Sequence, residues 1–203
     1  MSEVSAENRS ERDRLLELVT DHILEHGVAQ LTLRGLAAAV GSNNRMLLYY
    51  FGSKEQLTIE ALRNADGRFP RFQAAVNEMR NPSGDLRSTL ETAWAAISDP
   101  QTRPHARLFF ETFGLAVHQP EVYGALLGSV SSEWVQYITA LIQREGAPRK
   151  EAQILARELV SGWRGLEMDL LSSDDLRGIN AVARSAIAAL CARVSARWGP
   201  PAH

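Results

Sequence analysis

The chain has one cysteine, Cys191, among its 203 residues. A single cysteine excludes an intramolecular disulfide and leaves too few thiolates for a zinc or iron-sulfur site made of cysteines. Long apolar runs are also lacking: the longest unbroken one extends from Ala186 to Ala192, and the first 14 residues are mostly polar or charged. The sequence therefore predicts a cytoplasmic protein with no exported or membrane-spanning segment.

Signatures of common enzyme sites are missing as well. The sequence contains no GxGxxG or P-loop pattern, no HExxH metal site and no GxSxG elbow. His22 and His26 are one helical turn apart, but they have no third ligand nearby in the sequence, so two surface imidazoles are favoured over a metal site. We expect neither an enzyme nor a bound metal or cofactor.

Acidic residues are absent from residues 27–54, although the whole chain has 24 Asp and Glu against 22 Lys and Arg. Residues 1–26 contain seven acids and three arginines. The acid-free window contains Arg34, Arg45 and Lys54, a net charge of +3. This distribution favours a surface that approaches a negatively charged partner, and a chance gap in an apolar stretch is the alternative.

No stretch of the sequence alternates apolar and polar residues in the way that marks a β-strand. The apolar residues instead recur every three or four positions, as in helices. The sequence predicts an all-α fold of about nine helices: a three-helix head and a larger body of about six helices. The predicted domain boundary separates the head, residues 1–53, from the body, residues 54–203.

Helix ends are marked by residues with special backbone or capping properties. Gly67 and Pro70 are predicted to interrupt a longer helix that runs from Ser53 to about Met79. Four residues with side-chain oxygens are predicted to cap the starts of helices: Ser10, Thr32, Asn43 and Ser53.

Two short helices joined by a glycine-containing turn, after a longer helix, are the parts of a helix-turn-helix motif. Helical spacing places Asn44, Arg45 and Leu48 on one face of the second short helix, away from Leu47 and Phe51. These outward side chains suit adenine, guanine and a thymine methyl group, respectively. The residues expected to contact the DNA backbone are Thr32, Asn43, Tyr49, Tyr50 and Lys54.

Three runs of residues resemble the DNA-binding head of the TetR family of transcriptional regulators, and the similarity has no gap over residues 10–62. The runs are Leu31 to Ala37, Val40-Gly41 and Leu47 to Leu57, the last with its Phe-Gly-Ser-Lys-Glu turn. The resemblance implies a homodimer that binds a palindromic operator, usually as a repressor, and releases it when a small molecule occupies the body.

The resemblance also implies roles for single residues. Arg34, Asn44 and Arg45 match base-reading positions, and the positions that match DNA-backbone contacts are Thr32, Tyr49 and Lys54. Three residues differ from the usual family pattern: Arg45, Leu48 and Tyr50. These differences favour a changed base preference, with Arg45 seeking guanine.

The body is expected to enclose the effector and to form the dimer contact. Six aromatic residues are predicted to line the pocket: Trp94, Phe110, Phe113, Trp134, Tyr137 and Trp163. Five apolar residues on the last two helices are predicted to contact the second copy: Leu159, Leu166, Ile187, Leu190 and Val194. Ordinary core packing is the alternative for each of them.

The predicted function is thus a ligand-responsive transcriptional regulator, a repressor that binds an operator in double-stranded DNA as a homodimer and is released by an unknown small-molecule effector. The alternative is a helical protein of the same fold that binds a small molecule or a partner but no specific DNA. Leu48 and the acidic first helix favour that alternative.

Overall fold

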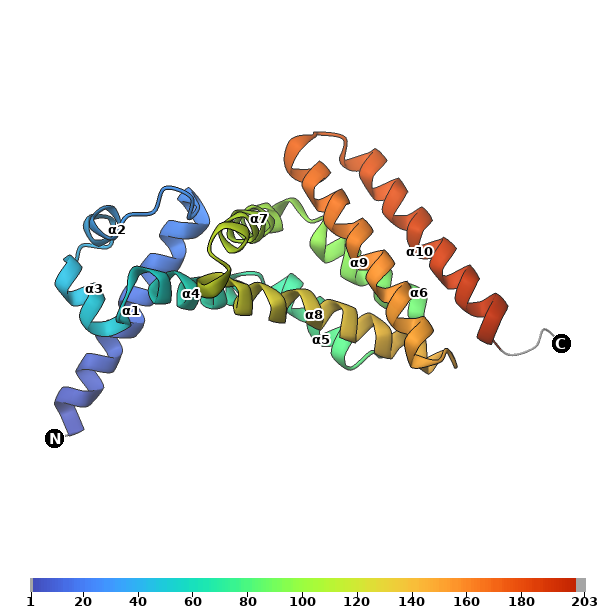
Figure 1. Ribbon diagram of the computed structural model, residues 1–203, viewed down its shortest axis with the longest axis horizontal. Coiled ribbons are helices and arrows are strands. Elements are labelled where there is room, and N and C mark those ends of the chain that lie inside the picture. The colour runs from blue at the N-terminus through green and yellow to red at the C-terminus, as the bar shows by residue number, and fades with distance from the viewer. Residues whose placement is uncertain (1, 200–203) are drawn as a thin grey trace. The chain divides into compact units, whose positions relative to one another are not determined.

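The computed structural model describes the backbone of residues 2–199 and the side chains of residues 10–125, 128 and 132–199. This part of the chain contains ten α-helices, two short 3-10 helices and no strand (Figure 1). The all-α prediction is confirmed. The tenth helix arises because the segment from Ser53 to Met79, expected as one interrupted helix, is two separate helices.

Contacts divide the chain into two compact units. The first unit combines the chain up to Phe69 with Arg107–Leu127, and the second combines Pro70–Ala106 with the chain from Gly128 onward. Two helices, α7 (Arg103–His118) and α8 (Pro120–Arg144), therefore contribute residues to both units. The functional division between residues 1–53 and 54–203 stays a prediction.

The first unit is built on α1 (Ser2–His26), α2 (Leu33–Ala39), α3 (Asn44–Phe51) and α4 (Lys54–Ala65), with parts of α7 and α8. We call α1 to α4 the head. Apolar residues from all four helices and from α7 meet in one core: Leu15, Val19, Ile23, Leu36, Leu47, Phe51, Leu57, Ala61 and Leu108.

Three of the four predicted caps are confirmed. The side-chain oxygens of Thr32, Asn43 and Ser53 each accept a hydrogen bond from the backbone N–H three residues later, at 3.0–3.1 Å. The prediction for Ser10 is wrong, because α1 already begins at Ser2. No glycine or proline separates Ser2 from Ser10, so nothing in the sequence stops the helix from extending backward.

The interruption expected at Gly67 and Pro70 is a complete break. The 3-10 helix η1 (Asp66–Arg68) follows α4 directly, Phe69 has a non-helical backbone, and α5 (Pro70–Arg80) starts at the proline. Proline suits the first helical position because its missing N–H would have no partner there, and it disfavours helical geometry in the residue before it. Pro70 therefore prevents α4 from continuing and is the first residue of α5.

The end of α1 is held by two side chains of α7 that belong to the same unit. Arg107 donates hydrogen bonds to the carbonyl oxygens of Leu24 and Glu25, at 2.5 and 2.9 Å. Glu111 accepts one from the backbone N–H of Val28, at 2.5 Å. These contacts satisfy backbone groups that have no partner within a helix at its end. Gly27, with φ of +79°, makes the turn there.

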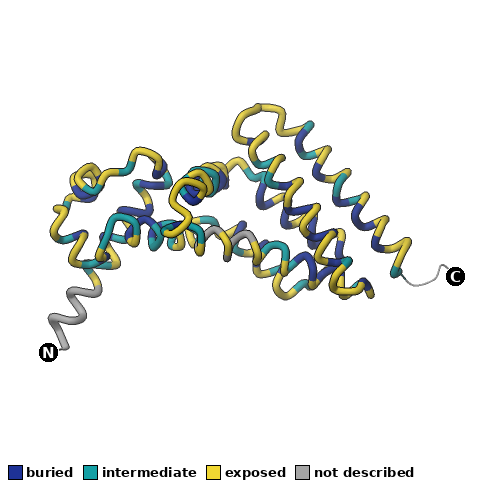
Figure 2. Tube along the Cα trace, in the orientation of Figure 1, coloured by how far each residue is buried: buried dark blue, intermediate teal, exposed yellow. Residues whose placement is uncertain are grey.

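The second unit contains α5, α6 (Leu86–Ile97), the 3-10 helix η2 (Pro100–Thr102), most of α8, α9 (Arg149–Ser172) and α10 (Leu176–Trp198). Helix α10 packs against α9 and α6, and α5 packs against α6. Figure 2 shows buried and exposed residues alternating along α9 and α10. Among the described helices, α10 alone is long and apolar enough to span a membrane by length and composition, yet one face of it lies in this unit's core.

We expect Gly27→Ala to destabilise the protein more than Gly41→Ala. Both glycines have positive φ, which costs an alanine about 1–2 kcal/mol. A Cβ at Gly27 would also collide with the Glu111 carboxylate, whereas a Cβ at Gly41 would meet nothing within 4 Å. Thermal or urea unfolding should give Gly27→Ala an extra loss of about 1–3 kcal/mol. Equal losses would mean that Glu111 moves aside freely.

Candidate nucleic-acid interface

Helix α3 separates its buried and exposed side chains as the spacing predicts. Leu47 and Phe51 are 1% and 3% exposed and lie in the core of the head. Asn44, Arg45 and Leu48 are exposed together on the opposite side, and Leu48 keeps 41% of its surface accessible. The structure thus brings the three candidate base-reading residues of α3 onto one accessible face, and their roles stay predictions.

The two arginines predicted to contact DNA are available for a partner. Arg34 and Arg45 are exposed and form no ion pair or hydrogen bond with any described residue. Three other arginines of the first unit form ion pairs: Arg12 with Glu60, Arg14 with Glu11, and Arg68 with both Glu17 and Asp21. Four acids of the α1 segment therefore have an arginine beside them: Glu11, Asp13, Glu17 and Asp21.

The capping residues Thr32 and Asn43 keep donors that can serve a phosphate. The Asn43 Oδ1 accepts the capping bond at 3.0 Å, which leaves its amide N–H groups exposed. The Thr32 hydroxyl accepts from Gly35 and retains its own hydrogen as a donor. Both residues directly precede a helix of the motif, so a phosphate contact there fixes the position of the motif on the duplex.

Three further candidates for the DNA backbone differ in how accessible they are. Tyr49 is 67% exposed, and its ring meets the edge of Tyr50, with 5.1 Å between the ring centroids. Tyr50 is partly buried against the core of the head. The Nζ of Lys54 donates to the Leu31 carbonyl at 3.4 Å and lies 3.8 Å from Glu55, so a phosphate would compete with these contacts.

The six aromatic residues predicted to line a ligand pocket do not form one cluster. Phe110 and Phe113 belong to the first unit, and Tyr137 accepts a hydrogen bond from Arg80 at 2.7 Å. Trp94, Trp134 and Trp163 do meet in the second unit. Two rings that the sequence analysis did not single out as pocket residues extend this cluster: Phe72, 5.8 Å from Trp134, and His105, 4.6 Å from Phe72, between ring centroids.

Two polar groups on α9 lie beside this aromatic cluster. The Trp163 indole N–H is buried and has no hydrogen-bond partner among the described residues, whereas that of Trp94 donates to Asn180 at 2.7 Å. Burial raises the pKa of Glu167 to about 7, against the opposing effect of His105 and Arg164. Sequence reasoning missed Glu167, although its place one turn after Trp163 was visible in the spacing.

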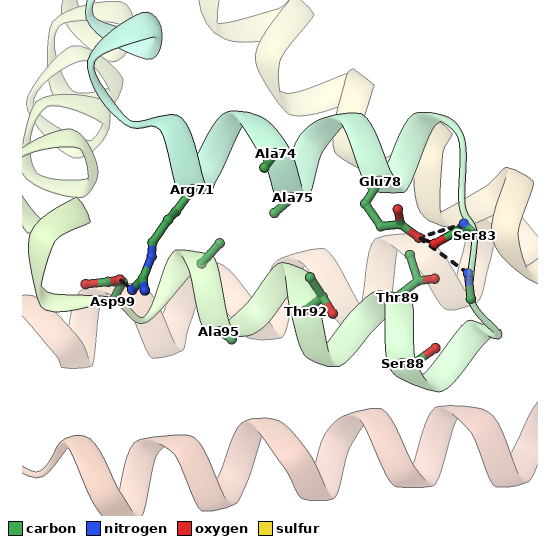
Figure 3. Close-up of a pocket in the computed structure, with 12 residues that line it drawn as sticks. Arg71, Ala74, Ala75, Glu78, Ser83, Ser88, Thr89, Thr92, Ala95 and Asp99 are labelled. Carbon is green, nitrogen blue, oxygen red and sulfur yellow. Dashed lines mark hydrogen bonds and ion pairs between the residues drawn. The ribbon is translucent and has the colours of Figure 1, made fainter.

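A groove of about 620 Å³ lies between α5 and α6. Its walls carry small residues, and Figure 3 shows an ion pair at one end, where Arg71 and Asp99 are 2.8 Å apart. At the other end the Glu78 carboxylate accepts from the backbone N–H and the hydroxyl of Ser83, at 2.6 and 2.8 Å. None of the six predicted aromatic residues lines this groove.

Four of the five residues predicted for the dimer contact are buried within the single chain: Leu159, Ile187, Leu190 and Val194. Leu166 is partly buried. The same two helices keep other apolar side chains exposed: Ile154, Met168, Leu171, Leu176 and Val182. The dimer contact itself stays a prediction. Cys191 is buried on α10, and burial raises the pKa of its thiol.

The raised pKa of Glu167 predicts a specific pH dependence of stability. The carboxyl binds its proton more tightly in the folded chain than at its ordinary pKa of 4.5, so stability falls as pH rises from about 4.5 to about 7. Glu167→Gln should remove this fall, so the variant should gain about 2–3 kcal/mol over the parent between pH 4.5 and pH 8 in urea unfolding. Glu158→Gln, an exposed change on the same helix, is the control. Parallel curves for parent and Glu167→Gln would contradict the raised pKa.

Comparison with known proteins agrees with this geometry. The family model of bacterial regulatory proteins of the TetR family matches residues 20–61, which include α2 and α3. The transcriptional repressor KstR2 of Mycobacterium tuberculosis is 32% identical over 98 residues, and the match spans 48% of this chain and about half (49%) of KstR2. The repressor NicS of Pseudomonas putida is 29% identical over 84 residues, which cover 41% of this chain and 40% of NicS.

Solved structures extend the similarity to the fold of nearly the whole chain. A transcriptional regulator of Rhodococcus has a TM-score of 0.74 at 18% identity, covering 90% of this chain and 96% of its own. A TetR-family regulator of Streptomyces coelicolor has a TM-score of 0.72 at 19% identity, with 94% and 97% covered. Residues 20–61 therefore match the TetR family model, and the chain has the fold of solved transcriptional regulators, one of them a TetR-family regulator.

Proposed function

We propose that the protein is a ligand-responsive transcriptional repressor that binds a palindromic operator as a homodimer. The observation that carries this proposal is the exposed face of α3, where Arg45 has no partner within the described chain and lies with Asn44 and Leu48. An arginine can donate two hydrogen bonds to guanine, and an asparagine can pair with adenine in the major groove. The exposed Leu48 suits a thymine methyl group.

The matched relatives support a regulator and not an enzyme. KstR2 and NicS are both transcriptional repressors, although each match spans half of the relative or less. A regulator of Saccharomonospora viridis with a TM-score of 0.72 at 22% identity, covering 89% of this chain and 96% of its own, was crystallised in complex with choline. That complex supports a body that accommodates a small organic molecule.

The proposed release mechanism uses two of the segments that connect the units: the break after α4, and helix α7. We place the hinge at the break over Asp66–Phe69, where α4 has ended and α5 has not begun. Helix α7 begins with residues of the second unit and ends with Arg107 and Glu111, which hold the end of α1. Dimer heads must enter major grooves about 34 Å apart, so a small turn is enough to weaken binding. A coupling of about 1–3 kcal/mol gives a useful switch.

The alternative, a helical binding protein without specific DNA contacts, drew support from the acidic first helix. The ion pairs of Glu17 and Asp21 with Arg68, and of Glu11 with Arg14, weaken that support because these acids have cations beside them. Leu48 remains compatible with either function. DNA binding distinguishes the two.

We expect the purified protein to bind DNA from upstream of its own gene, with an affinity that falls steeply as salt increases. Arg45→Ala should weaken binding by about 10- to 100-fold, the loss of one bidentate base contact, and should leave the unfolding transition unchanged. Arg149→Ala removes the same charge from an exposed position of the second unit and should bind like the parent. The measurement is fluorescence anisotropy across a salt series.

Weak binding that is equal for any DNA sequence and unaffected by Arg45→Ala would contradict the proposal. It would favour the alternative, a ligand-binding protein that does not recognise an operator.

A further inference from the structure

We propose that the groove between α5 and α6 is the effector site, and that the effector is a small primary amine with an apolar body. Its ammonium group lies between the Glu78 carboxylate and the Thr89 hydroxyl, and its body follows the small side chains of the groove. This inference rests on the proposed ligand-responsive function and names the place and the chemical class of the ligand. Both helices belong to the second unit, so the site lies within one compact unit.

The first observation is the Thr89 hydroxyl, which has no hydrogen-bond partner among the described residues. Thr89 is 2% exposed and lines the groove. A buried threonine in a helix usually donates its hydroxyl hydrogen to a backbone carbonyl one turn earlier. The other buried threonines of the described chain all donate to a backbone carbonyl: Thr20, Thr58, Thr102, Thr112 and Thr139. The Thr89 hydroxyl is therefore available to a molecule in the groove.

The second observation is the Glu78 carboxylate at the same end of the groove (Figure 3). Its Oε1 accepts from the Ser83 backbone N–H and hydroxyl, at 2.6 and 2.8 Å, and from the Gly84 N–H at 3.4 Å. These hydrogen bonds lower the pKa of Glu78, so the carboxylate is ionised at neutral pH. Its second oxygen accepts from no described residue.

Gly84 brings these two polar groups together. Its N–H donates to Glu78, and a Cβ on Gly84 would lie 3.7 Å from the Thr89 Oγ1. A ligand group at this end of the groove therefore meets a carboxylate and a hydroxyl. Both can accept hydrogen bonds, and a primary ammonium has three N–H donors to give them.

The cations close to Glu78 are held by other partners. Arg80 donates to the Tyr137 hydroxyl at 2.7 Å, and Arg144 donates to the Pro82 carbonyl at 3.4 Å. No described cation forms an ion pair with Glu78, and its pKa is lowered by hydrogen bonds and not by a neighbouring positive charge. A ligand ammonium supplies the missing counter-charge.

The rest of the groove carries no net charge. At the far end Arg71 and Asp99 lie 2.8 Å apart and neutralise each other. Glu78 therefore gives the lining a net charge of one negative unit, which favours a ligand with a single positive charge over a dication or an anion.

The size of the groove suits an unbranched apolar body. Small side chains line it between its two ends: Ala74, Ala75, Thr92, Ala95 and Ala96. They leave a volume of about 620 Å³. Arg71 and Glu78 are seven residues apart on α5, which corresponds to about 10 Å along the helix. A chain that extends from Glu78 toward Arg71 replaces water along this length.

The test uses the full chain and titration calorimetry at neutral pH, without DNA. Three probes share one apolar chain and differ in the charge of the head group: hexylamine, 1-hexanol and hexanoate. Hexylamine should bind at least about tenfold more tightly than either of the others, the effect of one charged hydrogen bond. Hexyltrimethylammonium keeps the positive charge but has no N–H, so it should bind severalfold more weakly than hexylamine.

Two substitutions separate the contributions of Glu78 and Thr89. Glu78→Gln should lower hexylamine affinity at least about tenfold. Glu91→Gln removes an exposed acid of α6 that pairs with Arg87 outside the groove, and it should bind hexylamine like the parent. Thermal unfolding of each variant checks that it folds.

Thr89→Val removes the hydroxyl and keeps the shape of the side chain, so it should lower hexylamine affinity severalfold. It should not lower the unfolding temperature, because the hydroxyl has no partner to lose. Thr139→Val is the matched control: it loses a hydrogen bond to the Val135 carbonyl, so it should unfold at a lower temperature and bind hexylamine like the parent.

Four outcomes would overturn the proposal. The first three are equal binding of hexylamine and 1-hexanol, unchanged hexylamine affinity in Glu78→Gln, and no binding of hexylamine at millimolar concentration. The fourth is parental affinity in Ala95→Trp, because a tryptophan at this exposed position of the groove wall should block the site.

The titration is independent of DNA, so the two proposals can fail separately. A protein that binds hexylamine but no operator would contradict the proposed function alone. A protein that binds its operator but not hexylamine would contradict this inference alone.

Discussion

The burial of Leu47 and Phe51 determines what α3 presents to a partner. Both side chains lie in a core that also contains Leu36 of α2 and Leu57 of α4, so α3 has one rotational setting in the head. The guanidinium of Arg12 stacks over the Phe51 ring and also pairs with Glu60, which adds a polar contact to the same apolar packing. With that setting fixed, Asn44, Arg45 and Leu48 face outward because no other orientation keeps the core buried.

The contacts at the end of α1 follow from the same constraint, that buried backbone groups need partners. Arg107 and Glu111 are one turn apart on α7, so one helix face supplies a donor to the carbonyls of α1 and an acceptor to the Val28 N–H. Gly27 is required there by its positive φ and by the close carboxylate. Any displacement of the Arg107–Glu111 segment must break these bonds or carry the end of α1 with it.

The sequence predicted what local chemistry controls and missed what depends on packing between distant segments. Thr32, Asn43 and Ser53 were recognisable because a cap acts on an N–H three residues away, and Pro70 because proline constrains its own neighbours. Val28 and Glu111 are 83 residues apart, and no local pattern relates them. The prediction of pocket residues was incomplete for the same reason. Aromatic content identified three tryptophans of the cluster, but it did not identify Phe72, whose ring lies between Trp134 and His105.

Trp94 and Trp163 differ in how packing provides for their buried N–H groups. Both side chains are 3% exposed and their rings are in contact, yet Asn180 accepts from the N–H of Trp94 and no described residue accepts from that of Trp163. A buried N–H without a partner costs about 1–3 kcal/mol, and a partly buried carboxyl with a raised pKa adds to that cost above pH 7. A phenylalanine and a leucine would remove both costs. The second unit therefore keeps two polar groups that lower its stability, because local spacing places them on a buried face without placing their partners.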